Sequence, residues 1–166
     1  MRKDTEQHTS EAEKLFIRAD QAEEQGRVEE AVELLLRAAT LEHTGAQINL
    51  GNQYSQGRGV PKSDSKAAYW YKRAYKNGEE SGALNLAIDK LKKGNSRSAI
   101  FWLKRAVEMH SGEAAVELAR IYLRNRRSKT KAIELLNLAQ KMKRSEISEQ
   151  AKEDAGALLA SIARTR

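Results

Sequence analysis

Residues 67–74 read Ala67-Ala-Tyr-Trp-Tyr-Lys-Arg-Ala74, a block with alanine at both ends and large apolar side chains between them. The chain of 166 residues holds three more blocks of this form, which are Ala31-Val-Glu-Leu-Leu-Leu-Arg-Ala38, Ala99-Ile-Phe-Trp-Leu-Lys-Arg-Ala106 and Ala132-Ile-Glu-Leu-Leu-Asn-Leu-Ala139. The blocks start at residues 31, 67, 99 and 132, which are 36, 32 and 33 residues apart. A period of this size indicates a repeat array, in which each unit buries its apolar face against its neighbours.

Apolar residues recur at helical spacing along the chain, and the only proline, Pro61, lies in a short Gly-containing loop. We therefore expect an all-α protein with helices over about 10–25, 28–42, 46–56, 65–76, 82–93, 96–110, 113–125, 129–143 and 146–163. Taken in pairs, these helices give about four helix-turn-helix repeats, over 10–43, 44–78, 81–110 and 112–143. Residues 1–9 are expected to form a flexible N-terminal arm, and residues 10–166 a single repeat domain.

The last expected helix, over 146–164, differs from the others because it has no partner later in the chain. Its apolar residues form one stripe at helical spacing, made of Ile147, Ala151, Ala155, Leu158 and Ile162. A helix with only one apolar face is expected to cover the end of a stack. The sequence therefore predicts a C-terminal capping helix.

The residue types that carry chemistry argue against an enzyme. Cysteine is absent, which excludes disulfides, thiolate metal sites and cysteine nucleophiles. His43 and His110 each precede a Thr-Gly or Ser-Gly pair, and we interpret both as helix C-terminal residues, where the dipole favours a positive imidazole. The sequence has no His-x-x-x-His pair and no Gly-x-x-x-x-Gly-Lys-Ser/Thr loop. We therefore expect no catalytic residue, no metal site and no cofactor.

The net charge of +7 is unevenly distributed. Residues 1–43 hold 6 Lys/Arg and 11 Asp/Glu, whereas residues 44–166 hold 24 and 12. This asymmetry suggests a partner of defined polarity, an RNA ligand for the basic half, or head-to-tail self-association. The alternative is that the charges have no binding role and lie on helix faces exposed to solvent. No apolar run reaches the roughly 18 residues that span a bilayer. We expect a cytoplasmic protein if Met1 is the native start, and a periplasmic or secreted one if a signal peptide was trimmed.

One stretch resembles a known family. Residues 50–74 contain Leu50-Gly51-x-x-Tyr54-x-x-Gly57-x-Gly59-Val60 and end in Trp70-Tyr71-Lys-Arg-Ala74, a long pattern similar to a Sel1-like repeat, which is a tetratricopeptide-type helical repeat. Residues 12–38 look more like an ordinary tetratricopeptide repeat, and the third and fourth repeats lack the Gly-x-Gly-Val loop. The resemblance implies a right-handed α-solenoid and a small bacterial-type adaptor that recruits partners rather than catalysing a reaction.

In tetratricopeptide-type stacks the first helix of each pair lines a concave groove, and the resemblance therefore implies a binding surface on those helices. The inward positions of the second to fourth repeats, with one basic residue of the following turn, give the predicted partner-binding set, which is Asn52, Leu84, Ile88, Leu91, Arg120, Leu123, Arg124 and Arg127. Apolar residues beside arginines fit an acidic-apolar protein segment. The alternative is that these residues pack against a neighbouring repeat or the capping helix.

We therefore expect a non-catalytic protein-interaction scaffold, with an RNA-binding helical repeat and a head-to-tail structural protein as alternatives. The aromatic residues Trp70, Tyr71, Phe101 and Trp102 are expected in the core, because buried aromatics dominate packing. This expectation ranks RNA binding second, since it leaves no exposed rings for bases to stack on.

Overall fold

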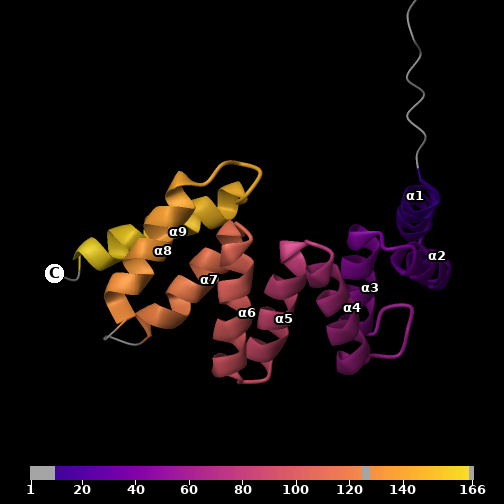
Figure 1. Cartoon of the computed structure of the whole chain (residues 1–166), viewed down its shortest axis with the longest axis horizontal. Coiled ribbons are helices and arrows are strands. Elements are labelled where there is room, and N and C mark those ends of the chain that lie inside the picture. The colour runs from indigo at the N-terminus through magenta and orange to yellow at the C-terminus, as the bar shows by residue number, and fades with distance from the viewer. Residues whose placement is uncertain (1–9, 125–127, 165–166) are drawn as a thin grey trace, which may run out of the picture. The chain divides into compact units, whose positions relative to one another are not determined.

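The computed structural model describes residues 10–124 and 128–164 of the chain. This part forms nine helices (Figure 1), which are α1 (Glu11–Glu24), α2 (Val28–Thr40), α3 (Thr44–Gln56), α4 (Asp64–Lys76), α5 (Glu80–Lys92), α6 (Ser96–Glu108), α7 (Gly112–Leu123), α8 (Lys129–Lys141) and α9 (Glu149–Arg164). Each predicted helix is found, with its ends shifted by at most three residues. The described residues contain no strand, so the prediction of an all-α protein of helix-turn-helix repeats with a final helix is confirmed.

The helices fall into two compact units, residues 1–77 with α1 to α4 and residues 78–166 with α5 to α9. Inside each unit, consecutive helices pair as hairpins, α1 with α2 and α3 with α4, then α5 with α6 and α7 with α8. The predicted continuous domain over 10–166 stays a prediction. The predicted arm, 1–9, lies outside the described residues.

The alanines that open and close each sequence block lie at the centre of these hairpins. All eight are at most 4% exposed, and each pair sits on the second helix of its repeat. Seven residues are close to two helical turns, so the two alanines of a block share one face. Small side chains on that face let the first helix approach closely, and the spacing of the blocks therefore reports the hairpin interfaces.

The Gly-containing loop of the second repeat packs against the first repeat. Gly57 ends α3 in the left-handed conformation with φ of 75°, and Gly59 has φ of 68°. A Cβ at Gly59 would lie 2.8 Å from Cγ1 of Val28, so the loop backbone sits directly on α2. Val60, next in the chain, packs against the core of this unit. Glycine is required here by both conformation and space.

His43 corrects one interpretation of the sequence. It does not end a helix: it is the N-cap of α3, and its Nδ1 accepts a hydrogen bond from the backbone N–H of Ala46 at 3.0 Å. Its Nε2 lies 2.9 Å from Oε2 of Glu13 on α1. An imidazole that accepts through Nδ1 carries its proton on Nε2, so this ring is neutral and donates to Glu13. Glu42, the residue before His43, has the left-handed backbone conformation. His110 has the same conformation in the third repeat.

Glu42 connects the two hairpins of the first unit. Its carboxylate pairs with Arg73, and it accepts hydrogen bonds from Nδ2 of Asn77 at 2.6 Å and from Nε2 of Gln47 at 3.1 Å. Gln47 is fully buried and also donates to the carbonyl oxygen of Ala39 at 3.1 Å. The hydrogen bonds from Arg73 and Asn77 lower the pKa of Glu42 to about 2.

This network predicts acid sensitivity. The ordinary pKa of 4.5 falls to about 2 in the folded chain, so the stabilisation from ionised Glu42 is complete above about pH 4.5 and is lost as pH falls toward 2. Urea unfolding of the Glu42→Gln variant should therefore show a flatter loss of stability over this interval than the parent chain. Glu33→Gln, at an exposed glutamate of α2, is the matched control. If both variants follow the parent profile, the Glu42 network does not stabilise the fold.

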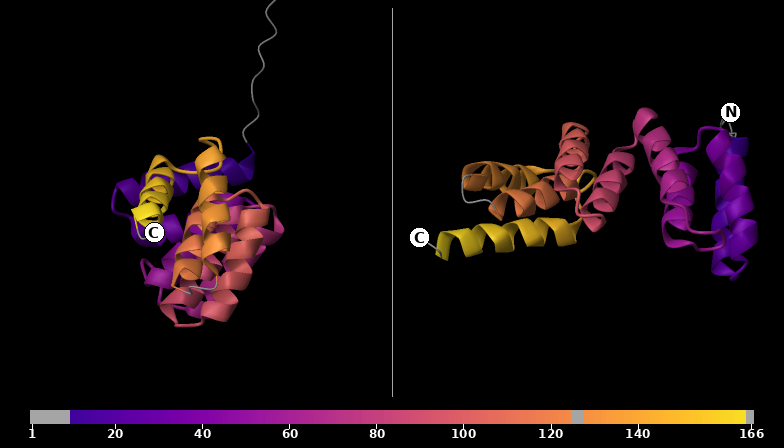
Figure 2. Two further views of the ribbon diagram at one scale, coloured as in Figure 1. Left: turned by 90° about the vertical axis from the view of Figure 1, so that its left-hand side faces the viewer. Right: turned by 90° about the horizontal axis from the view of Figure 1, so that it is seen from below.

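In the second unit α9 packs along α8 and also contacts α7, as Figure 2 shows. The predicted stripe is confirmed from Ala151 onward: Ala151, Ala155 and Ile162 are at most 9% exposed, and Leu158 packs against the same core. Ile147 is also buried, but it lies before α9 and not on it. The helix begins three residues later than predicted because the segment before it is engaged elsewhere. The carbonyl oxygen of Glu146 accepts a hydrogen bond from the backbone N–H of Gly112 at 2.7 Å.

The prediction that four aromatic residues lie in the core is half right. Trp70 and Tyr71 are buried, at 6% and 4% exposed, but Phe101 is 51% exposed and Trp102 is half-buried. Leu103 is fully buried, and two residues along a helix correspond to a rotation of about 200°. Phe101 is therefore turned to solvent, where Trp102 contacts its ring edge-to-face at 5.2 Å.

Candidate functional site

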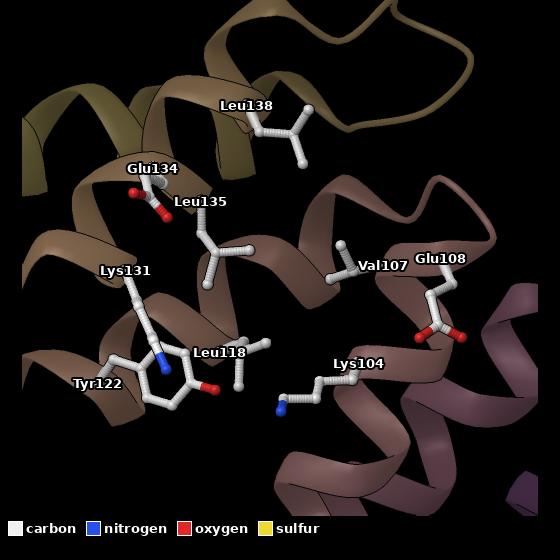
Figure 3. Close-up of a pocket in the computed structure, with 9 residues that line it drawn as sticks. All are labelled: Lys104, Val107, Glu108, Leu118, Tyr122, Lys131, Glu134, Leu135 and Leu138. Carbon is white, nitrogen blue, oxygen red and sulfur yellow. The ribbon is translucent and has the colours of Figure 1, made fainter. Parts of the chain in front are cut away.

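The second unit carries a groove between α6 and α8. Val107 on α6 and Leu135 and Leu138 on α8 form its apolar walls, and Leu118 and Tyr122 on α7 lie at its floor (Figure 3). The cavity measures about 440 Å³, which is within the range of pockets that bind small molecules or short segments. These residues, with Lys104, Glu108, Lys131 and Glu134, are called the α6–α8 groove below.

Charged side chains form the rim of this groove. Lys104 precedes Glu108 by four residues on α6, and Lys131 precedes Glu134 by three residues on α8. Glu108 pairs with Arg105 at 2.9 Å, whereas Lys104, Lys131 and Glu134 have no ion-pair partner within the described chain. An apolar floor with a polar rim is the usual anatomy of a protein interface.

Sequence reasoning missed this groove, although the sequence held a signal for it. The seventh position of the repeated block is arginine in three repeats, at residues 37, 73 and 105, and leucine in the fourth, Leu138. Leu138 is 42% exposed. A leucine at a position that is arginine in the other repeats marks a surface that differs in the last repeat.

The predicted residues of α5 lie on one helix and are all half-buried, namely Leu84, Ile88 and Leu91. Leu84 also lines a second cavity of about 450 Å³, together with Glu80, Glu113 and the segment 144–148. Burial raises the pKa of Glu80, and the nearby carboxylates of Glu79 and Glu113 raise it further. The α5 face is therefore only partly open to a partner.

The predicted residues of α7 meet α9. Nη2 of Arg120 lies 2.6 Å from Oδ2 of Asp154, and its Nε lies 3.3 Å from Glu117. Leu123 packs against the core that α9 completes, and Arg124 is exposed. Arg127 lies outside the described residues. The alternative that the sequence left open, packing against the capping helix, applies to Arg120 and Leu123.

Asn52, the predicted residue of the first unit, lines a polar cavity of about 200 Å³ between α1 and α3. Its Oδ1 accepts a hydrogen bond from the Tyr71 hydroxyl at 2.8 Å. At the same cavity Glu23 pairs with Arg58 at 2.6 Å. Asn52 therefore has a structural role in positioning a core tyrosine.

The residues over 10–124 and 128–164 contain no group of three or more His, Asp or Glu side chains placed to hold a metal ion. Within the same ranges no helix combines the length and hydropathy needed to cross a membrane.

Comparison with known proteins agrees with the repeat pattern. The model of the Sel1 repeat matches residues 28–43, 44–79 and 85–111. A comparison with curated proteins gave no significant match. The second match ends at residue 79, within two residues of the boundary between the two units.

Solved structures resemble the chain in fold. A Sel1 repeat protein from Oxalobacter formigenes has a TM-score of 0.67 and 20% identity, over 78% of this chain and 58% of its own. A protective antigen of uropathogenic Escherichia coli with an SLR fold has a TM-score of 0.64 and 20% identity, over 89% of this chain and 38% of its own. The chain thus spans less than two thirds of the length of either protein. The two solved structures share the fold of this chain, and the three repeat matches place the chain in the Sel1 repeat family.

Proposed function

We propose that this chain is a non-catalytic adaptor that binds a segment of a partner protein, and that the α6–α8 groove holds the segment. Sel1 repeats commonly mediate protein–protein interaction, and the family is not typically enzymatic. The observation that carries the proposal is the groove itself, in which exposed Leu138 continues a floor of buried and half-buried apolar side chains. An exposed leucine that extends an apolar groove is surface that a partner helix would bury.

A selection experiment tests this proposal without knowledge of the natural partner. Random helical peptides displayed on phage are selected against the whole chain, and the enriched peptides are titrated against variants. We expect Leu138→Asp to weaken them about 30-fold, which corresponds to losing one apolar anchor of about 2 kcal/mol. Leu36→Asp is the matched control, because Leu36 is 41% exposed on α2 and Leu138 is 42% exposed.

Leu91→Asp is the third variant, and it tests the face that the sequence predicted. Circular dichroism checks that each variant keeps its helices. Peptides weakened by Leu91→Asp and not by Leu138→Asp would assign binding to the α5 face and reject the groove. Equal losses with Leu36→Asp and Leu138→Asp would mean that binding is not specific to either site.

The exposed rings favour a second function, binding of single-stranded RNA. Tyr69 and Phe101 are 56% and 51% exposed, and the guanidinium of Arg105 lies 5.4 Å from the Phe101 ring. Aromatic faces beside arginines can stack with bases. An oligouridine titrated in the same assay separates the two functions, since phosphate binding weakens steeply with salt.

A further inference from the structure

We propose that the α6–α8 groove selects an amphipathic helix with a basic first turn and an acidic last turn, and that the helix binds with its C-terminal end at Lys104 and Lys131. This inference rests on the proposed function and adds the chemistry and direction of the partner segment. It follows from the order of charges along the two walls of the groove.

The two walls have the same polarity. On α6 the lysine comes before the glutamate, and on α8 the lysine again comes before the glutamate. Figure 3 shows Lys104 and Lys131 toward the Tyr122 end of the groove, with Glu134 on the side of Leu138. The groove therefore has a basic end, formed by Lys104 and Lys131, and an acidic side chain, Glu134, at the opposite end.

The rim charges at the basic end are available to a ligand. Lys104 and Lys131 are exposed and have no ion-pair partner in the described chain. Glu134 is likewise exposed without such a partner, and only Glu108 is engaged, by Arg105. A helix that places its own carboxylates at the two lysines and its own lysines at Glu134 would form new ion pairs there. None of these three groove residues would have to give up an existing ion pair in the described chain.

The helix dipole sets the direction of binding. The C-terminus of a helix carries a partial negative charge of about half an elementary charge. That end is attracted to the two lysines, and the partial positive N-terminus is attracted to Glu134 and Glu108. The apolar residues of the ligand, at positions i, i+4 and i+7, would then contact Val107, Leu135 and Leu138.

Two model peptides of about four turns test the inference. They have the same composition and the same leucine stripe, and differ only in charge order: the matched peptide has lysines in its first turn and glutamates in its last, and the reversed peptide has the opposite order. The reversed peptide is the better isolated helix, because its charges suit its own dipole. We nevertheless expect the matched peptide to bind the whole chain about tenfold more tightly at low salt.

The double variant Lys104→Glu/Lys131→Glu leaves carboxylates at both ends of the groove and should therefore abolish this preference, and salt of about 0.5 M should reduce it in the parent chain. If both peptides bind equally and Leu138→Asp weakens both, the groove binds helices without selecting polarity, so this inference is overturned and the proposed function stands. If neither peptide binds, the proposed function fails with it. Tighter binding of the reversed peptide to the parent chain would assign the opposite direction and also overturn the inference.

Discussion

Replacing Gly112 by alanine should destabilise the second unit by about 3 kcal/mol, because one added carbon has no room. A Cβ at this position would lie 2.3 Å from Cβ and 2.6 Å from Cγ1 of Ile147. These atoms are next to the backbone and cannot swing away as the end of a long side chain could. Ile147 lies two residues before α9, is 4% exposed and packs in the core that α9 completes. The alanine must therefore push the segment before α9 off the start of α7.

The measurement is thermal unfolding, with an expected fall in Tm of roughly 12 °C for a unit of this size. Hydrogen exchange should also accelerate in the amides of α9, whose docking depends on this contact. Gly156→Ala is the control inside α9, since its Cβ would meet only Nε2 of Gln140 at 3.3 Å. Alanine is the better helix former by about 0.5–1 kcal/mol, so this variant should be neutral or more stable. Two variants of equal stability would refute the tight contact between Gly112 and Ile147.

Replacing Gly51 by alanine should have an effect of similar size in the first unit. The added Cβ would lie 2.4 Å from Cε1 and 2.6 Å from Cδ1 of the Tyr71 ring. Tyr71 is 4% exposed and its hydroxyl donates to Asn52, so the ring is fixed at both ends. Moving it costs overpacking strain and the hydrogen bond, together about 3 kcal/mol. Urea unfolding followed by circular dichroism measures this loss.

The other repeats supply the rescue for this variant. The residues that correspond to Gly51 and Tyr71 are Ala87 and Leu103 in the third repeat, and Ala119 and Leu136 in the fourth. The double variant Gly51→Ala/Tyr71→Leu should therefore be more stable than the sum of its single variants predicts, with a coupling of about 1–3 kcal/mol. If the stability losses of the two single variants simply add, the alanine at residue 51 does not act on the Tyr71 ring.

The repeat pattern was readable from the sequence because it depends on local rules. The alanines seven residues apart mark the buried face of each second helix, and all of them are buried. The stripe from Ile147 to Ile162 identified the capping helix by its period alone, and the structure buries it. Helical period and turn residues act over a few residues, so a single chain displays them fully.

The errors arose where side chains far apart in the sequence meet. His43 was interpreted as a helix end, yet Glu13, thirty residues earlier, and Ala46 make it a neutral N-cap. Phe101 was expected in the core because it is aromatic, but Leu103 holds the buried position on its helix. The predicted role of Arg120 in binding a partner stays a prediction, and the structure adds an ion pair with Asp154 of α9 that the sequence did not indicate. The residue types and the helical period would be the same in the predicted and in the observed surroundings of these side chains. Neither signal could therefore distinguish the two.

By itself, the sequence determined the helices, their pairing into repeats and the burial of the small residues between them, since these follow from helical periodicity and from the φ values that glycine permits. Only the tertiary structure decided which exposed side chains gather into one site. The α6–α8 groove combines residues of three helices. Its shape depends on how those helices pack, which no segment of the chain specifies alone.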